Sequence, residues 1–302
     1  MKIMKFDRRF FSPGRLTFCI LNTIILTFLA LICVLPLIHV LAVSFSDKSA
    51  VSAGFVTFWP VKFTLESYKY ILKTPAFLRS VGVTLERVVI GLPLSLLLTM
   101  MTAYALSKDS KDFRGRTFYA WFFIVTTMFG GGLIPFYMTI KFTGIMDTIW
   151  ALVLPTAVQV FNVVLMLNFF RGLPKEIEES AFVDGAGYWT ALWRIVVPIS
   201  TPSIATVALF TFVSQWNAWF DGLLLMNSPN HYPLQSYLQA IISQSTVELN
   251  FLDAEDWKKL AVISDRTVKS SQIFLGALPI LLIYPFLQRY FVKGIVLGSV
   301  KG

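Results

Sequence analysis

Six long apolar stretches dominate this sequence and restrict what it can fold into. They are residues 16–43, 81–106, 117–140, 146–170, 199–226 and 271–288. Crossing the hydrocarbon core of a bilayer takes ~20 mainly apolar residues in a helix, because every backbone N–H and C=O must then be bonded within the segment. Charged residues make up only 14% of the chain, against about 25% in soluble domains. The sequence predicts an all-α polytopic membrane protein with six transmembrane helices.

The predicted organisation is a tail at 1–15, a membrane domain at 16–288 with a polar loop at 171–198, and a second tail at 289–302. The first apolar stretch follows several basic residues but is too long for the apolar part of a secretion signal, so we expect a retained helix. Lys and Arg are about twofold denser in the segments that face inward when the N-terminus is inside. Both termini are therefore expected in the cytoplasm and the chain in the plasma membrane.

Several kinds of chemistry have no support in the sequence. A phosphate-binding G-x-x-x-x-G-K-[ST] loop is excluded because no Gly-Lys pair occurs. The two histidines, His39 and His231, lie far apart and form neither a zinc motif nor a Cys/His cluster. The basic residues do not gather in one soluble region, as a nucleic-acid-binding surface requires. We expect no catalytic residue, no metal, no bound cofactor and no nucleic-acid partner.

The loop at 171–198 is acidic and interrupted by glycines, which is unusual in so apolar a chain. Its pattern predicts a helix from about Pro174 to Asp184, a sharp turn at Gly185 and Gly187, and a second helix ended by Pro198. One interpretation is an amphipathic connector at the membrane interface, but such helices carry Lys and Arg on their polar face. The acidic residues favour a protein partner with a basic groove.

A signature in this loop resembles a known family. Glu179-Ser180-Ala181, then Gly185 after three residues and Ile195-x-Val197-Pro198 after nine more, resembles the E-A-A-x3-G-x9-I-x-L-P signature of ABC importer permeases. Ser180 stands for the first alanine of that signature and Val197 for its leucine. The resemblance identifies the loop as a coupling helix that contacts the ATPase. Its expected coupling residues are Glu179, Ser180, Ala181, Asp184, Gly185, Gly187 and Pro198.

Further short motifs resemble the carbohydrate-uptake branch of this family: FTLESY at 63–68, QWN at 215–217 and FVKG at 291–294. GGGLIP at 130–135 and NFFR at 168–171 look like a subgroup that imports poly- or oligosaccharides. Short glycine and aromatic motifs also arise where helices pack closely.

The resemblance implies an assembly in a bacterial cell membrane. The implied partners are a second permease subunit, two cytoplasmic ATPase subunits, which would bind the ATP and Mg, and an extracytoplasmic solute-binding protein that delivers a sugar. In this family the end of the chain, from Gly294, also reaches the ATPase interface in some members; a frayed terminus is the alternative.

Polar side chains near the middle of the spans are candidates for the sugar path, because such groups are costly in lipid and face the bundle interior or a pathway. The expected path residues are Gln159, Asn162, Gln215, Trp216, Asn217 and Trp219. The alternative is hydrogen bonding between helices and an aromatic belt. Glu86 and Arg87 lie near the outer end of the second span, so we expect them to snorkel or pair rather than touch sugar.

Two other function classes remain open from the residues alone. A secondary transporter would use acids deep in the membrane as ion sites, and the sequence has almost none there. A membrane scaffold without a transport cycle would carry the coupling signature by accident. Binding of an ATPase subunit would separate a permease from both.

Overall fold

The structure, a computed structural model, describes residues 13–243 and 265–299. Most of the expected N-terminal tail at 1–15 therefore lies outside the described residues, as do residues 244–264 and the last three residues of the expected C-terminal tail. Within the described ranges the only β contact is an isolated antiparallel bridge between Ser46 and Phe63. The all-α fold predicted from the sequence is confirmed.

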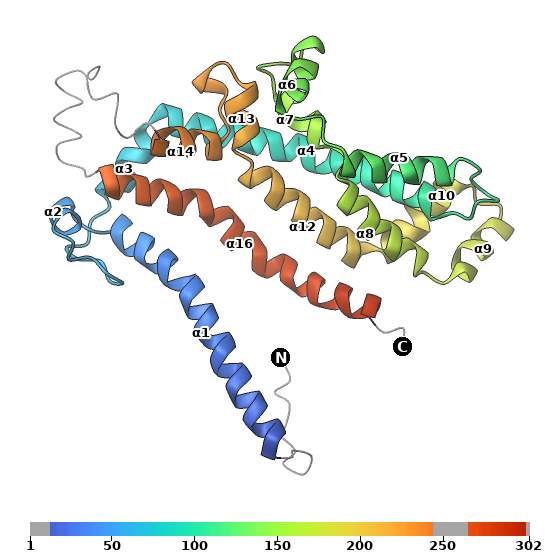
Figure 1. The fold of residues 1–302 in the computed structure, drawn as a ribbon, viewed down its shortest axis with the longest axis horizontal. Coiled ribbons are helices and arrows are strands. Elements are labelled where there is room, and N and C mark those ends of the chain that lie inside the picture. Colours follow the sequence, from blue (N-terminus) through green and yellow to red (C-terminus); the bar gives the residue numbers. More distant parts are fainter. Residues whose placement is uncertain (1–12, 244–264, 300–302) are drawn as a thin grey trace. The chain divides into compact units, whose positions relative to one another are not determined.

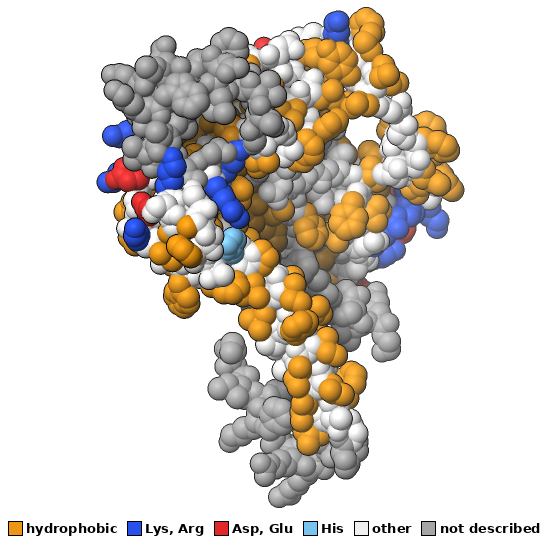
Figure 2. Space-filling view, turned by 60° about the vertical axis from the view of Figure 1, so that its left-hand side comes forward, with side chains coloured by type: hydrophobic (Ala, Val, Ile, Leu, Met, Phe, Trp, Pro, Cys, Tyr) orange, Lys and Arg blue, Asp and Glu red, His pale blue; other side chains and the backbone are white. Residues whose placement is uncertain are grey.

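The chain divides into two compact units, residues 1–71 with 251–275, and residues 72–250 with 276–302. The first unit contains α1 (Pro13–Ser44), whose side chains from residue 14 to residue 38 are all exposed. A helix that is apolar on every side is typical of a membrane span, because lipid covers it at no cost. Hydrophobic side chains are likewise spread over the face drawn in Figure 2, where Lys and Arg form only small groups.

The end of α1 is held by a short capped helix. The Asp47 side chain accepts a hydrogen bond from Ser49 N at 2.9 Å and starts α2 (Lys48–Ser52), because an N-cap acceptor satisfies an otherwise unpaired helical N–H. α3 (Glu66–Lys73) and α16 (Asp265–Ser299) also begin in this unit. A small apolar core joins α1 to α2: Ala42, Val43, Ala50, Val51 and Val56.

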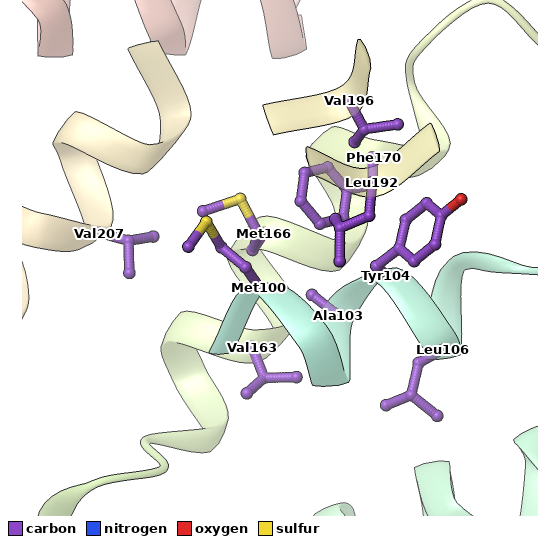
Figure 3. Packing of buried hydrophobic residues seen from close by; sticks show 10 residues of the cluster. All are labelled: Met100, Ala103, Tyr104, Leu106, Val163, Met166, Phe170, Leu192, Val196 and Val207. Atoms are coloured by element: carbon purple, nitrogen blue, oxygen red, sulfur yellow. The ribbon is translucent and has the colours of Figure 1, made fainter. Parts of the chain in front are cut away.

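The second unit is built around α4 (Pro75–Ser107), which packs against α8 (Val160–Arg171) and α12 (Thr201–Asn217) (Figure 1). An apolar cluster fills the space between these helices toward the C-terminal end of α4. Figure 3 shows Met100 of α4 and Met166 of α8 turned toward each other at its centre. The cluster comprises Met100, Ala103, Tyr104, Leu106, Val163, Met166, Phe170, Leu192, Val196 and Val207.

By length and composition, the described residues contain three helices able to cross a membrane, or up to six spans if each of three bent helix pairs counts as one. The single helices are Gly14–Ser44, Pro75–Ser107 and Arg266–Pro285. The second of these begins at Pro75, six residues before the span expected at 81–106, because proline is accepted at a helix start.

The third and fourth expected spans, 117–140 and 146–170, are each occupied by a bent pair of helices. α5 (Arg116–Met128) and α6 (Leu133–Phe142) meet at 118°, across a glycine run in which Gly132 has φ +86°. Only glycine adopts such an angle without strain. α7 (Ile149–Val153) and η2 (Leu154–Thr156) meet α8 at 45°. Pro155 in η2 lacks the N–H that a continuous helix uses.

The fifth span, expected at 199–226, is also interrupted. The helical segment Tyr188–Ile199 meets α12 at 84°, and α12 ends at Asn217 rather than at 226. α13 (Phe220–Leu225), η4 (Pro229–His231) and α14 (Leu234–Ser243) follow as separate short elements. Paired prolines, Pro198 and Pro202, flank the bend at Ser200, where each removes a backbone donor.

Candidate functional site

The backbone of the loop at 171–198 forms the predicted helix, turn and helix. α9 (Lys175–Val183) ends in a turn where Gly185 has φ +83°. Ala186 N donates to Ala181 O at 2.9 Å, and Gly185 N donates to Phe182 O at 3.1 Å. These two bonds satisfy carbonyls at the helix end and require a residue that tolerates positive φ. Gly185 is therefore needed for the turn, as the sequence indicates.

The second half of the loop is a helical segment made of three short pieces. α10 (Tyr188–Ala191) is followed by η3 (Leu192–Val196), a turn of π-helix, and by α11 (Val197–Ile199). Pro198 lies in this last piece, just before the bend into α12. Leu192 and Val196 are buried in the cluster of Figure 3, so this half is packed onto the helix bundle.

α9 presents one exposed side. The exposed residues of the expected coupling set are Glu179, Ser180, Asp184, Gly185, Gly187 and Pro198, whereas Ala181 is buried. Apolar side chains accompany them: Val183 is 87% exposed and Trp189 is 62% exposed. Exposed apolar groups among acids are typical of a protein-binding surface rather than of a solvated helix.

The opposite side of α9 is fixed to the end of α4. The Glu178 carboxylate accepts a hydrogen bond from the Tyr104 hydroxyl and forms an ion pair with the Lys108 ammonium. The same ammonium lies 3.9 Å from the centre of the Tyr104 ring. The Arg171 guanidinium donates to Leu106 O at 3.1 Å. α4, α8 and α9 are thus joined at this end of the bundle by charged contacts.

A more exposed ion pair lies beside this connection. The Lys175 ammonium is 3.0 Å from the Asp109 carboxylate. This hydrogen bond from Lys175 lowers the pKa of Asp109, and the same bond raises the pKa of Lys175. Sequence reasoning missed both connections, because nothing in the spacing of residues 104–109 and 175–178 indicates that they meet.

The expected path residues do not all lie together. Gln159 and Asn162 form a chain across α8 and α12: Gln159 Nε2 donates to Ser214 Oγ at 3.2 Å, and Asn162 Nδ2 donates to Gln159 Oε1 at 3.1 Å and to Thr211 Oγ1 at 3.2 Å. Asn162 is fully buried, whereas Gln159 is half-buried. Gln159 and Asn162 are therefore joined by a hydrogen bond and connected to α12.

The remaining path candidates divide between the interior and the surface. Gln215 and Trp216 are buried, and the Trp216 indole donates to Gly276 O at 2.9 Å. Asn217 and Trp219 are exposed. Trp216 stacks on Phe212 with ring centres 5.8 Å apart, so in this structure its ring faces are used in packing.

A buried ion pair joins α4 to α13. The Arg87 guanidinium, 1% exposed, binds both carboxylate oxygens of Asp221 and donates to Leu152 O at 3.3 Å. Gly222 N also donates to Asp221 Oδ1 at 2.9 Å. Of the two expectations for Arg87, snorkelling or pairing, the structure shows pairing. Its partner Asp221 was not identified from the sequence, because it lies beyond the middle of any expected span. Across residues 13–243 and 265–299 no group of three or more His, Cys, Asp or Glu is placed to hold a metal ion.

Comparisons with known proteins relate the whole chain to transport proteins. No family model matches the chain. It is 39% identical over 291 residues to protein LplC of Bacillus subtilis, covering 96% of this chain and 97% of that one. It is 38% identical over 274 residues to the polygalacturonan/rhamnogalacturonan transport system permease protein YtcP of the same organism, covering 90% and 94%.

A solved structure gives the same result. A chain of a bacterial ABC transporter involved in the import of the acidic polysaccharide alginate superposes with a TM-score of 0.85. That chain is 32% identical, and the match covers 93% of this chain and 99% of that one. The similarity therefore extends over the full fold and is not limited to the loop signature.

Proposed function

Because the chain belongs to the sugar permease subunits of ABC transporters, we propose that its loop at 171–198 is the site where ATP hydrolysis on partner subunits is converted into movement of the helix bundle. Family membership establishes an integral membrane subunit of a sugar importer. The secondary-transporter and scaffold alternatives are therefore set aside.

The observation that carries the proposal is the two-sided construction of α9. Its exposed side offers Glu179, Asp184 and apolar Val183 to a partner, while its inner side is bound through Glu178 to α4. A partner that moves α9 would move α4 with it, because a charged pair and a hydrogen bond hold the two helices together. Movement of packed elements as rigid bodies is an established mode of switching.

The proposed partners are two cytoplasmic ATPase subunits with a basic groove, a second permease subunit, and an extracytoplasmic solute-binding protein that delivers the sugar. ATP and Mg would bind the ATPase subunits, and this chain would supply no catalytic residue. With the coupling loop in the cytoplasm, both termini lie there too, and the chain crosses the bacterial plasma membrane several times.

The proposed sugar path contains Gln159, Asn162, Gln215, Trp216, Asn217 and Trp219. The support for this path is that burying polar amide side chains inside a membrane bundle costs free energy, so buried amides such as Asn162 and Gln215 indicate a functional role. We propose an oligosaccharide as the cargo, since YtcP is named for polygalacturonan/rhamnogalacturonan transport and the matching solved structure is of a transporter involved in alginate import.

The test of the coupling proposal is the variant Glu179→Lys, expressed together with the partner ATPase subunits that support uptake by the wild-type chain. A reversed charge on the exposed side should repel a basic groove, so the ATPase should dissociate during purification and ATP-driven uptake into vesicles should stop. Glu176→Lys, one turn nearer the start of α9 and also exposed, is the comparison for a general charge effect. Normal ATPase binding and uptake by Glu179→Lys would refute the proposal.

A further inference from the structure

α4 carries a row of small and hydroxyl residues on the side that packs against α12. Gly91, Ser95 and Thr99 are spaced four residues apart, so they share one helix face, and all three are buried. A Cβ atom placed on Gly91 would lie 2.7 Å from both amide atoms of Gln215. The Gln215 amide therefore rests directly on the backbone of α4 at Gly91, where only glycine leaves room for it.

Several buried polar side-chain atoms on α4, α8 and α12, including the Gln215 amide, are unpaired. Of the residues that the structure describes, none hydrogen-bonds either amide atom of Gln215, the hydroxyl of Ser95 or Thr99, or the Asn162 carbonyl oxygen. Gln215 is only 2% exposed. Buried polar groups are nearly always bonded, so a group of unpaired ones indicates a special role.

Other buried hydroxyls on the same helix show that α4 does not leave such groups unpaired throughout. Ser80 Oγ donates to Phe77 O at 2.8 Å, and Thr84 Oγ1 donates to Ser80 O at 3.1 Å and accepts from Leu234 N at 2.7 Å. Most of the unpaired buried side-chain atoms in the described part of the chain instead belong to Ser95, Thr99, Asn162 and Gln215. These four residues belong to α4, α8 and α12, the three helices that pack against one another.

We propose that Gly91, Ser95, Thr99, Asn162 and Gln215, here called the polar seam, bind hydroxyl groups of the sugar when α4 and α12 move apart, and that the structure shows the seam closed. This inference rests on the proposed function and adds Gly91, Ser95 and Thr99 to the path. In the closed state the seam loses its hydrogen bonds; in the open state it regains them with sugar hydroxyls or water. Gly91 lets the two helices close fully over the Gln215 amide.

The chemistry of the seam selects hydroxyls rather than carboxylates. Its side chains are amides and hydroxyls, which carry no charge. The nearest cation along α4 is Arg87, one turn from Gly91, and both carboxylate oxygens of Asp221 already engage it. A uronic acid unit of the cargo would therefore be held here through its hydroxyl groups.

The experiment uses the assembled transporter, with the native Cys19 and Cys33 replaced by serine. Ser95→Cys and Thr99→Cys are treated with a charged, water-soluble thiol reagent in the nucleotide-free state and after vanadate trapping of ATP. Both cysteines should react in one state and be protected in the other, by at least about tenfold in rate. Val163→Cys, in the apolar cluster beside Asn162, should react in neither state. Absence of labelling at Ser95→Cys and Thr99→Cys in both states would overturn the inference.

A second measurement separates sugar contact from packing. Ser95→Ala removes a buried hydroxyl that has no protein partner, so the thermal stability of the complex in detergent should stay the same or rise. Uptake should fall about fivefold at low sugar concentration, as expected for one lost hydrogen bond. The sugar is chosen from galacturonan, rhamnogalacturonan and alginate oligosaccharides after wild-type uptake is shown. Unchanged uptake, or a loss of stability matching the loss of uptake, contradicts sugar contact at Ser95.

The outcomes also distinguish this inference from the proposed function. If Ser95→Ala transports normally and Ser95→Cys is not labelled in either state, while Glu179→Lys still releases the ATPase, the polar-seam inference is wrong and the coupling role stands. If Glu179→Lys has no effect, the coupling proposal itself fails whatever the labelling shows.

Discussion

The contact between Glu178 and α4 gives a prediction in which two neighbouring residues behave differently. Glu178→Gln keeps the shape of the side chain but removes its charge, so the ion pair with Lys108 is lost and the bond from Tyr104 weakens to a neutral one. The Glu178 side chain is 25% exposed and that of Lys108 11%. In its degree of burial the contact is intermediate between a surface ion pair, which contributes about 0–1 kcal/mol, and a buried charged hydrogen bond, which contributes about 1.5–3 kcal/mol. We expect a loss of about 1–2 kcal/mol.

The assay is SDS-induced unfolding of the purified chain in mixed micelles, combined with ATPase and uptake measurements on the complex. Glu178→Gln should lower the unfolding free energy and lower uptake per ATP hydrolysed, while the ATPase still binds. Glu179→Gln, exposed and one residue away, should leave the unfolding free energy unchanged and weaken ATPase binding.

A double-mutant cycle with Tyr104→Phe isolates the direct contact. Because the two side chains share one hydrogen bond, the effects of Glu178→Gln and Tyr104→Phe should be non-additive. Additive effects, or equal stability of Glu178→Gln and Glu179→Gln, would refute the claim that Glu178 fastens α9 to α4.

Three further predictions concern other described contacts. Asp221→Asn leaves the Arg87 guanidinium buried without its counter-charge and should lower the free energy of SDS unfolding by about 3 kcal/mol. The double variant Arg87→Met with Asp221→Leu should recover most of that loss. A double variant no more stable than the single one would contradict the ion-pair account. Gly185→Val forces a β-branched residue into φ +83°, so it should lower the unfolding free energy by about 1–3 kcal/mol and stop uptake. Gly187→Val, at φ −83°, should leave the unfolding free energy nearly unchanged. Equal losses of stability in the two variants would show that strain in the turn is not the cause. The ion pair lowers the pKa of Asp109 and raises that of Lys175. Its stabilisation should therefore be present between pH 3.8 and pH 10.5, be lost in acid as the pH falls through the folded pKa of Asp109, and be lost in alkali as the pH rises through the folded pKa of Lys175. The measurement is the difference in unfolding free energy between wild type and Lys175→Met across pH, and a difference that persists in acid would argue against the pair.

Local rules predicted the backbone of the loop at 171–198 well. The acid-rich start of α9, the glycine at φ +83° and the second helical segment all follow from residues close together in the chain. Few residues other than glycine adopt a positive φ without strain, so Gly185 indicates the turn without any tertiary information. The exposure of Glu179 and Asp184 follows as well, because an acidic face on a short amphipathic helix has nothing apolar to pack against.

The spans were predicted less completely. Hydropathy locates apolar segments long enough to cross a bilayer, but it averages over the single glycines and prolines that bend them. The bend at Gly132 and the end of α12 at Asn217 therefore did not appear in the predicted boundaries. Whether a glycine or proline breaks a helix in a membrane depends on whether neighbouring helices satisfy the freed backbone groups.

The sequence by itself determined that this chain is an all-α membrane protein, because apolar length and charge placement can be read locally. Its resemblance to permeases also rests on a local feature, the signature in the loop at 171–198. Only the tertiary structure decided which polar side chains meet: Glu178 with Tyr104, Arg87 with Asp221, and Gln215 with the bare backbone of Gly91. The physical reason is that these pairs join residues far apart in the chain, and spacing along a chain carries no record of which helix faces come together. Burial between helices, and with it the loss of hydrogen bonds along the polar seam, exists only once the bundle is packed.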